Sequence, residues 1–147
     1  MSEEAVEVIR EAWKAFGEAG MEAVLEYCAD DCVSEDFPEL PDGATYHGPD
    51  GYLERYRHFA EAWGEFVIAP VEFIGAGDGA VVVVVEMTGS GPASGTPLDA
   101  RAGFLYEVRN AKIAYDRAFT SRSQALEAAR LAEGSEMELA GLEPATS

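Results

Sequence analysis

Asp36 is the first residue of this sequence whose surroundings suggest chemistry. It follows the segment 30–35 (Asp-Asp-Cys-Val-Ser-Glu) and is followed directly by Phe37 and Pro38. A carboxylate walled by aromatic and aliphatic groups is poorly solvated, which strengthens it as a proton acceptor and suits a general base. The alternative is that Asp36 only caps the following turn, because Asp often hydrogen-bonds the backbone ahead of a Pro-containing loop.

Arg101 and Asp116 form the second candidate set. Side chains alternate between the two faces of a strand, so Arg101 and Leu105 share a face of one predicted strand. Asp116 and Thr120 share a face of the next. Arg101 could pair with Asp116 across this hairpin, and the pair would orient or polarise a substrate if both faces line a pocket. It is also a common structural salt bridge, because cross-strand pairs of opposite charge stabilise sheets without any catalytic role.

Aromatic and aliphatic residues supply the walls of a predicted pocket. Tyr56 and Trp13 can each donate one hydrogen bond to a ligand oxygen, although both residue types also occur as ordinary core. His47 precedes Gly48-Pro49, and we expect it to hold this loop locally rather than to act in catalysis. Most of the apolar residues are core, and those that line the pocket favour an apolar ligand. The predicted ligand-binding set is Trp13, Tyr56, Val83, Val85, Met87, Leu105 and Thr120.

The composition excludes several classes of partner. The chain has 147 residues, which predicts one domain, and 28 acidic against 10 basic residues give a net charge of −18. That charge repels phosphate backbones and anionic lipids, so we expect neither nucleic-acid nor membrane binding. The same charge leaves open a basic partner protein. The acidic N-terminus lacks the basic and apolar regions of a signal peptide, which predicts a cytoplasmic location.

Cofactor and metal chemistry have no sequence support. Cys28 and Cys32 are four residues apart but have no His-Cys cluster around them, so we expect two reduced thiols and no metal site. The glycine-rich run 75–79 joins two predicted strands rather than opening a helix, so it is not a phosphate loop. We therefore predict a protein without a cofactor.

Hydrophobic periodicity predicts an α+β fold of one domain over residues 1–133, with a flexible C-terminal tail over 134–147. Helices are expected at 3–16, 21–29 and 48–63, a short extended piece at 32–37, long strands at 66–74, 80–88, 99–109 and 112–120, and a short last helix at 124–132 with Ser121 as its N-cap. A curved antiparallel sheet wrapped on the three N-terminal helices makes a cone-shaped barrel. Such a cone encloses a pocket, the ordinary place for a ligand.

This order of elements resembles the SnoaL-like branch of the nuclear transport factor 2-like superfamily. The resemblance covers roughly residues 5–132. It is carried by residues 12–16 (Ala-Trp-Lys-Ala-Phe), 27–36 (Tyr-Cys-Ala-Asp-Asp-Cys-Val-Ser-Glu-Asp), 46–49 (Tyr-His-Gly-Pro), 103–106 (Gly-Phe-Leu-Tyr), 112–113 (Lys-Ile) and 124–129 (Gln-Ala-Leu-Glu-Ala-Ala). It implies a small homodimer with one pocket per subunit. Tyr115, Arg117 and Phe119, on the outer face of the sheet, suit such an interface.

The resemblance implies a catalytic role for Asp36, at the place of the base in ketosteroid isomerase, whose tuned carboxyls are a worked example of pKa control. The tyrosine and second carboxyl of that enzyme fall on Trp13 and Gly103. Arg101 and Asp116 resemble part of the Asp-Arg-Asp set of limonene-epoxide hydrolase, and the acid of SnoaL-type cyclases falls on Ala118. Every known catalytic set is thus present only in part, and this fold hosts many reactions.

Two functions follow as expectations. The first is an enzyme that binds a small apolar molecule and uses Asp36 as general base for proton transfer or water addition, with Arg101 and Asp116 orienting the substrate. The second is a non-catalytic module that binds a ligand or serves dimerisation.

Overall fold

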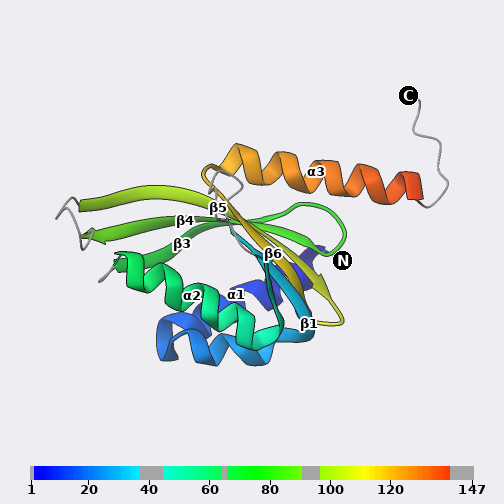
Figure 1. Ribbon diagram of the computed structural model, residues 1–147. Helices are drawn as coiled ribbons and strands as arrows, with labels where there is room; N and C mark the ends of the chain where they lie inside the picture. The colour runs from blue at the N-terminus through cyan, green and yellow to red at the C-terminus, as the bar shows by residue number, and fades with distance from the viewer. Residues whose placement is uncertain (1, 37–44, 64–65, 91–96, 140–147) are drawn as a thin grey trace.

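The computed structural model describes residues 2–36, 45–63, 66–90 and 97–139. Its elements are α1 (Ser2–Ala19), the 3₁₀ helix η1 (Met21–Tyr27), β1 (Cys28–Glu35), β2 (Thr45–His47), α2 (Gly48–Trp63), β3 (Phe66–Gly75), β4 (Ala80–Ser90), β5 (Pro97–Arg109), β6 (Lys112–Phe119) and α3 (Arg122–Leu139). A curved sheet has α1 and α2 on its concave side and α3 on the other side (Figure 1). The predicted α+β cone is confirmed.

The strand order in the described sheet is β2-β1-β6-β5-β4-β3. Neighbouring strands are antiparallel except β1 and β6, which are parallel and place Ser34 beside Asp116. The prediction of a wholly antiparallel sheet is therefore wrong for β1 and β6, and the short strand β2 was not predicted. No tight hairpin joins β1 to β6, so the hairpin rule that fixes antiparallel pairing for β3 to β6 does not apply to them.

The concave face carries the main core. In α1 the buried residues Ala5, Ile9 and Ala12 follow helical spacing and pack in one cluster with Val81, Val83 and Val85 of β4. These β4 residues alternate with Val82, which faces the other way. The apolar run of β4 is therefore covered on both faces, which explains why it shows no alternation of polar and apolar residues.

The convex face is covered by α3. Ala125 and Ala129 of this helix are buried against Val82, Leu105 and Phe119. Gly103 lies under the start of α3, where an added Cβ would come within 2.8 Å of the Ser121 carbonyl oxygen and 2.9 Å of the Ala125 Cβ. The absence of a side chain at position 103 lets the helix approach the sheet this closely.

Local signals set most element boundaries. Asn110 and Ala111 both have positive φ, 55° and 62°, which is the geometry of a tight hairpin turn between β5 and β6. Ser121 caps α3 by accepting a 3.2 Å hydrogen bond from the backbone N–H of Gln124, as predicted. The helix then continues to Leu139, past the expected end at 132 and into the expected tail. Residues 140–147 of the predicted tail lie outside the described residues, as do 38–43 and most of 89–97, two stretches for which no helix or strand was predicted.

Candidate functional site

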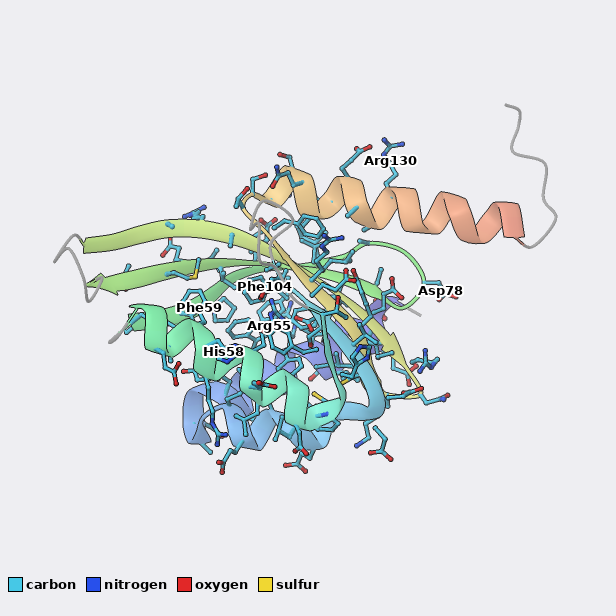
Figure 2. The ribbon with its side chains drawn as sticks, in the orientation of Figure 1. Arg55, His58, Phe59, Asp78, Phe104 and Arg130 are labelled. Atoms are coloured by element: carbon cyan, nitrogen blue, oxygen red, sulfur yellow. The ribbon has the colours of Figure 1, made fainter. Side chains whose placement is uncertain are left out.

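A cavity of about 420 Å³ lies between the concave face of the sheet and the helices α1, η1 and α2. Its walls are mostly apolar, and its polar groups are four ionisable side chains (Asp36, Arg55, His58 and Asp116), four tyrosine hydroxyls and the indole of Trp13. The residues that line it include Trp13, Phe16, Asp36, Tyr46, Tyr52, Arg55, Tyr56, His58, Phe59, Phe66, Phe104, Tyr106, Asp116 and Ala118. Figure 2 labels Arg55, His58 and Phe59 on α2 and Phe104 on the sheet.

Asp116 forms the floor of the polar end of this cavity. A bulge at Ala114 shifts the β5–β6 register, so that Ile113 and Asp116 both line the cavity although they are three residues apart. The Asp116 side chain is 1% exposed. Its Oδ1 accepts a 2.5 Å hydrogen bond from the buried Ser34 hydroxyl of β1. The parallel β1–β6 pairing is what brings these two residues together.

Arg55 of α2 joins two carboxylates at this end of the cavity. Its Nη1 donates a 2.6 Å hydrogen bond to Asp116 Oδ2, and its Nε donates a 3.2 Å hydrogen bond to Asp36 Oδ1. The Arg55 side chain is 14% exposed and that of Asp36 is 22% exposed. Burial by itself would lower the pKa of Arg55, but the attraction and hydrogen bond of Asp116 outweigh it and raise that pKa. The guanidinium therefore stays charged.

Two buried phenols lie next to this cluster. Tyr106 of β5 pairs in register with Asp116 of β6, so both side chains project from the same face of the sheet. Burial raises the pKa of Tyr106, and the charge of Asp116 raises it further. Burial likewise raises the pKa of Tyr52 on α2. Both hydroxyls are therefore neutral at pH 7 and can donate hydrogen bonds.

The apolar wall is a continuous series of rings. Successive ring centroids are 4.9 Å apart for Phe59–Phe66, 6.0 Å for Phe66–Tyr56, 5.7 Å for Tyr56–Phe16, 5.6 Å for Phe16–Trp13, 6.1 Å for Trp13–Phe104 and 6.4 Å for Phe104–Tyr106. The Trp13 indole N–H is buried, makes no hydrogen bond of ordinary geometry and lies close enough to the Tyr106 hydroxyl to lower its pKa slightly. It is therefore an available donor in the cavity wall.

A second polar pair lines the cavity nearer to solvent. The Tyr46 hydroxyl of β2 and Nδ1 of His58 on α2 are 3.1 Å apart, and His58 Nε2 lies 3.9 Å from Glu54. Burial and the nearby charge of Asp36 raise the pKa of Tyr46. His47, which we expected to hold the loop before α2 rather than to act in catalysis, is exposed and does not line the cavity.

The predicted Arg101–Asp116 pair is wrong. Arg101 instead forms a 2.6 Å ion pair with Glu86, directly opposite on β4, and its side chain is 66% exposed. The alternation was assigned correctly for β6, where Asp116 and Ala118 line the cavity, but it was inverted for β5. On β5 the cavity-facing residues are Phe104 and Tyr106.

Several other residues predicted to bind the ligand do not line the cavity, and only Leu105 among them is misplaced by the inverted alternation of β5. Leu105 packs under α3, and Gly103 faces the same way, so a carboxyl at position 103 would not enter this cavity. Thr120 lies past the end of β6 and donates a 2.8 Å hydrogen bond to Gln124. Val83, Val85 and Met87 are buried core residues that do not line the cavity. The predicted residues that do line it are Trp13, Asp36, Tyr56 and Asp116.

Arg55 and Tyr106 are the site residues that the sequence analysis missed. A signal for Arg55 was present, because Tyr52, Arg55, Tyr56 and Phe59 follow the i, i+3, i+4, i+7 spacing of one helix face. A cation within an apolar helix stripe requires a buried partner, and two carboxylates provide it here. For Tyr106 the only signal was the strand alternation that was assigned with the wrong phase.

Both cysteines are buried and free, and in the described part of the chain no group of three or more His, Cys, Asp or Glu residues could hold a metal ion. The Cys28 thiol donates a hydrogen bond to Cys32, and this bond together with burial raises the pKa of Cys28. None of the helices searched within the described ranges is long and apolar enough to cross a membrane.

Several solved structures share the fold of this chain at low sequence identity. An NTF2-like protein from Burkholderia thailandensis superposes with a TM-score of 0.71 at 19% identity, covering 83% of this chain and 96% of its own. A predicted SnoaL-like polyketide cyclase from Jannaschia gives 0.67 at 16% identity, with 86% and 90% covered. A protein with a ketosteroid isomerase-like fold from Catenulispora acidiphila, in complex with trimethylamine, gives 0.64 at 18% identity, with 96% and 97% covered.

The SnoaL-like domain family matches residues 9–115, which is most of the chain. The protein therefore belongs to the SnoaL-like family, within the NTF2-like fold. No functionally curated protein matches its sequence.

Proposed function

We propose that this protein binds a small, largely apolar organic molecule in the cavity and catalyses proton transfer or water addition on it, with Asp36 as general base. The observation that carries the proposal is the Asp36–Arg55–Asp116 cluster at one end of an otherwise aromatic-lined cavity of about 420 Å³. Ligand sites have this composition, with apolar walls and a few convergent polar groups.

The two carboxylates have different roles in this proposal. Asp116 is 1% exposed, and Ser34 and Arg55 each donate to one of its oxygens, so it holds Arg55 in place rather than meeting the substrate. Asp36 is more exposed and lines the cavity, so its carboxylate is the one that a substrate can reach. Arg55 replaces Arg101 as the residue that orients or polarises the substrate.

Neutral donors would stabilise charge that develops on a substrate oxygen. The Trp13 indole N–H and the Tyr106 hydroxyl both line the cavity. Because burial raises the pKa of Tyr106, that phenol keeps its proton and can donate it in a hydrogen bond to an oxyanion. Donors of this kind act most strongly where water is excluded.

A Kemp elimination on 5-nitrobenzisoxazole tests the base without knowledge of the natural substrate. A carboxylate removes the ring C–H proton, the electron pair forms the nitrile, and the N–O bond breaks to release a coloured nitrophenolate. We expect turnover above that of free acetate, and a fall in kcat of about 10²–10⁴ in Asp36→Asn, the usual contribution of general base catalysis. Asp30→Asn is the matched control, since Asp30 is exposed and does not line the cavity. Equal rates in wild type and Asp36→Asn would remove Asp36 from the mechanism.

A non-catalytic binding module is the second candidate function. One observation favours it: Arg55 already donates a hydrogen bond to Asp36, so proton transfer has to break or share that bond. This candidate predicts ligand binding without any Asp36-dependent elimination. The trimethylamine in the Catenulispora protein adds little to either candidate, because 18% identity shows a shared fold alone.

We also propose a cytoplasmic location. Cys28 and Cys32 are free thiols only four residues apart, which suits a reducing compartment. Expression of a fluorescently tagged chain would locate the protein.

A further inference from the structure

We propose that the cavity selects molecules that carry a protonated amine on an aromatic or alicyclic body, with the ammonium beside Asp36 and the body along the aromatic wall. The inference deepens the proposed function and rests on its cavity as the ligand site. Two properties of the cavity support it: the sum of the charges that line it and the aromatic chemistry of its wall.

The charges that line the cavity do not cancel. All ten Lys and Arg residues lie within the described residues, and Arg55 is the one among them that lines the cavity. Asp36 and Asp116 both line it. Leaving His58 aside, the charged side chains among the described lining residues therefore sum to one negative charge. A ligand cation restores neutrality, whereas a ligand anion adds to the excess.

The single cation is already committed to the two carboxylates. Arg55 gives its Nη1 to Asp116 at 2.6 Å and its Nε to Asp36 at 3.2 Å. Most other basic residues form ion pairs away from the cavity, namely Arg57–Glu22, Arg101–Glu86, Arg109–Asp31, Arg117–Glu35, Arg122–Glu72 and Arg130–Glu127. An anionic ligand would have to compete with two carboxylates for Arg55, which is costly in a partly buried site.

The wall favours a cation as well. Seven rings succeed one another from Phe59 to Tyr106 with centroids 4.9–6.4 Å apart. The faces of aromatic rings carry negative electrostatic potential, and Trp and Tyr attract cations most strongly. Trp13 and Tyr56 belong to this series. The protein's net charge of −18 also raises the local concentration of cations around it.

Three probes of matched shape test the selectivity: 4-phenylbutylamine, 4-phenylbutan-1-ol and 4-phenylbutanoate, titrated calorimetrically into the full chain at neutral pH. The expected order of affinity is amine, then alcohol, then carboxylate. We expect the amine to bind about tenfold more tightly than the alcohol, which corresponds to about 1.4 kcal/mol. An alcohol that binds as tightly as the amine, or a carboxylate that binds best, would overturn the inference.

Two variants assign the selectivity to its residue. Asp36→Asn should reduce the preference for the amine to near unity while leaving the affinity for the alcohol within about twofold, since it removes the charge but keeps the shape. Asp30→Asn should keep the full preference, although it makes the net charge less negative by the same one unit. Loss of preference in both variants would attribute it to the overall field and contradict the role given to Asp36.

The outcomes separate this inference from the proposed function. If elimination depends on Asp36 but the three probes bind alike, the selectivity is wrong and the proposed function stands. If the amine is preferred through Asp36 and no elimination occurs, the catalytic role is wrong and the selectivity stands. If none of the probes binds, the inference is overturned.

Discussion

Arg55 and Asp116 form an ion pair of 2.6 Å in which the carboxylate is 1% and the arginine 14% exposed. The carboxylate is satisfied on its other oxygen by Ser34. Desolvating two charges this deeply buried costs free energy. Removing only one partner costs more, because the other charge is then left buried and unpaired. The first consequence of the pair is therefore for stability.

We expect Arg55→Met to lower the free energy of unfolding by about 3–5 kcal/mol, because it leaves the Asp116 charge buried without a cation. Urea denaturation measures this. The double variant Arg55→Met/Asp116→Asn should recover part of the loss, since the buried charge is gone. Arg101→Met is the control, because its pair with Glu86 is exposed and should contribute less than about 1 kcal/mol. Similar losses for Arg55→Met and Arg101→Met would contradict the assignment.

Gly103→Ala tests the contact between α3 and the sheet. The new Cβ would lie 2.8 Å from a backbone oxygen and 2.9 Å from the Ala125 Cβ. We expect a loss of about 1–3 kcal/mol in the free energy of unfolding, as for other overpacked sites. Gly17→Ala is the matched control: position 17 lies inside α1 with nothing near its added Cβ, so this change should stabilise by about 0.5–1 kcal/mol. A neutral Gly103→Ala would show that α3 can move away at no cost.

The buried tyrosines predict a loss of stability at alkaline pH. Burial raises the pKa of Tyr106 and Tyr52 above the ordinary 10.0, so the folded protein keeps phenolic protons that the unfolded chain releases. Stability is then full below about pH 10 and falls as the pH rises further, by about 1.4 kcal/mol per pH unit for each such tyrosine.

Denaturant midpoints measured between neutral pH and the alkaline range check this slope. Tyr106→Phe should make the fall in stability with rising pH less steep, because it removes one of the phenols that stay protonated only in the folded chain. Ultraviolet absorbance of tyrosinate should show a fraction of the tyrosines titrating only on unfolding. A midpoint independent of pH above 10 would contradict the burial of both phenols.

Homodimer formation through the outer face of the sheet stays a prediction, with a changed interface. Tyr115 donates a 2.7 Å hydrogen bond to Glu35, and Arg117 lies 3.4 Å from the same carboxylate. Phe119 is buried under α3 and is not available to a partner. Light scattering after size exclusion should give twice the monomer mass. Arg117→Glu should reduce this mass, because the new carboxylate would lie beside that of Glu35 and repel it at the interface. A monomeric wild-type chain would end this proposal.

Most of the fold could be predicted from the sequence because its signals are local. The apolar spacing in α1, the Asn110-Ala111 turn and the Ser121 cap each depend on residues within one or two turns of chain. The parallel pairing of β1 with β6 depends on residues far apart, so no local pattern specifies it. The short strand β2 was missed because three residues are too few to show a period.

The site was predictable only in part for the same reason. Asp36 and Trp13 were found because their immediate neighbours and helical spacing mark them. Arg101 was chosen over Arg55 because the phase of β5 was assigned without knowing which face α3 covers. Gly103, which was interpreted as a missing acid, is instead the residue that admits α3 to the other face. When apolar residues occur at both odd and even positions of a strand, the sequence does not show which of its two faces points into the cavity.

The pairing of β1 with β6 also sets the order of assembly. Ser34 and Asp116 are 82 positions apart, whereas β3 to β6 can pair as successive hairpins. Closing the long loop costs more chain entropy than closing a hairpin, so we expect β1 to dock late in folding. Until it docks, β6 presents an open edge to other chains, which is where aggregation of a slow-folding variant would begin.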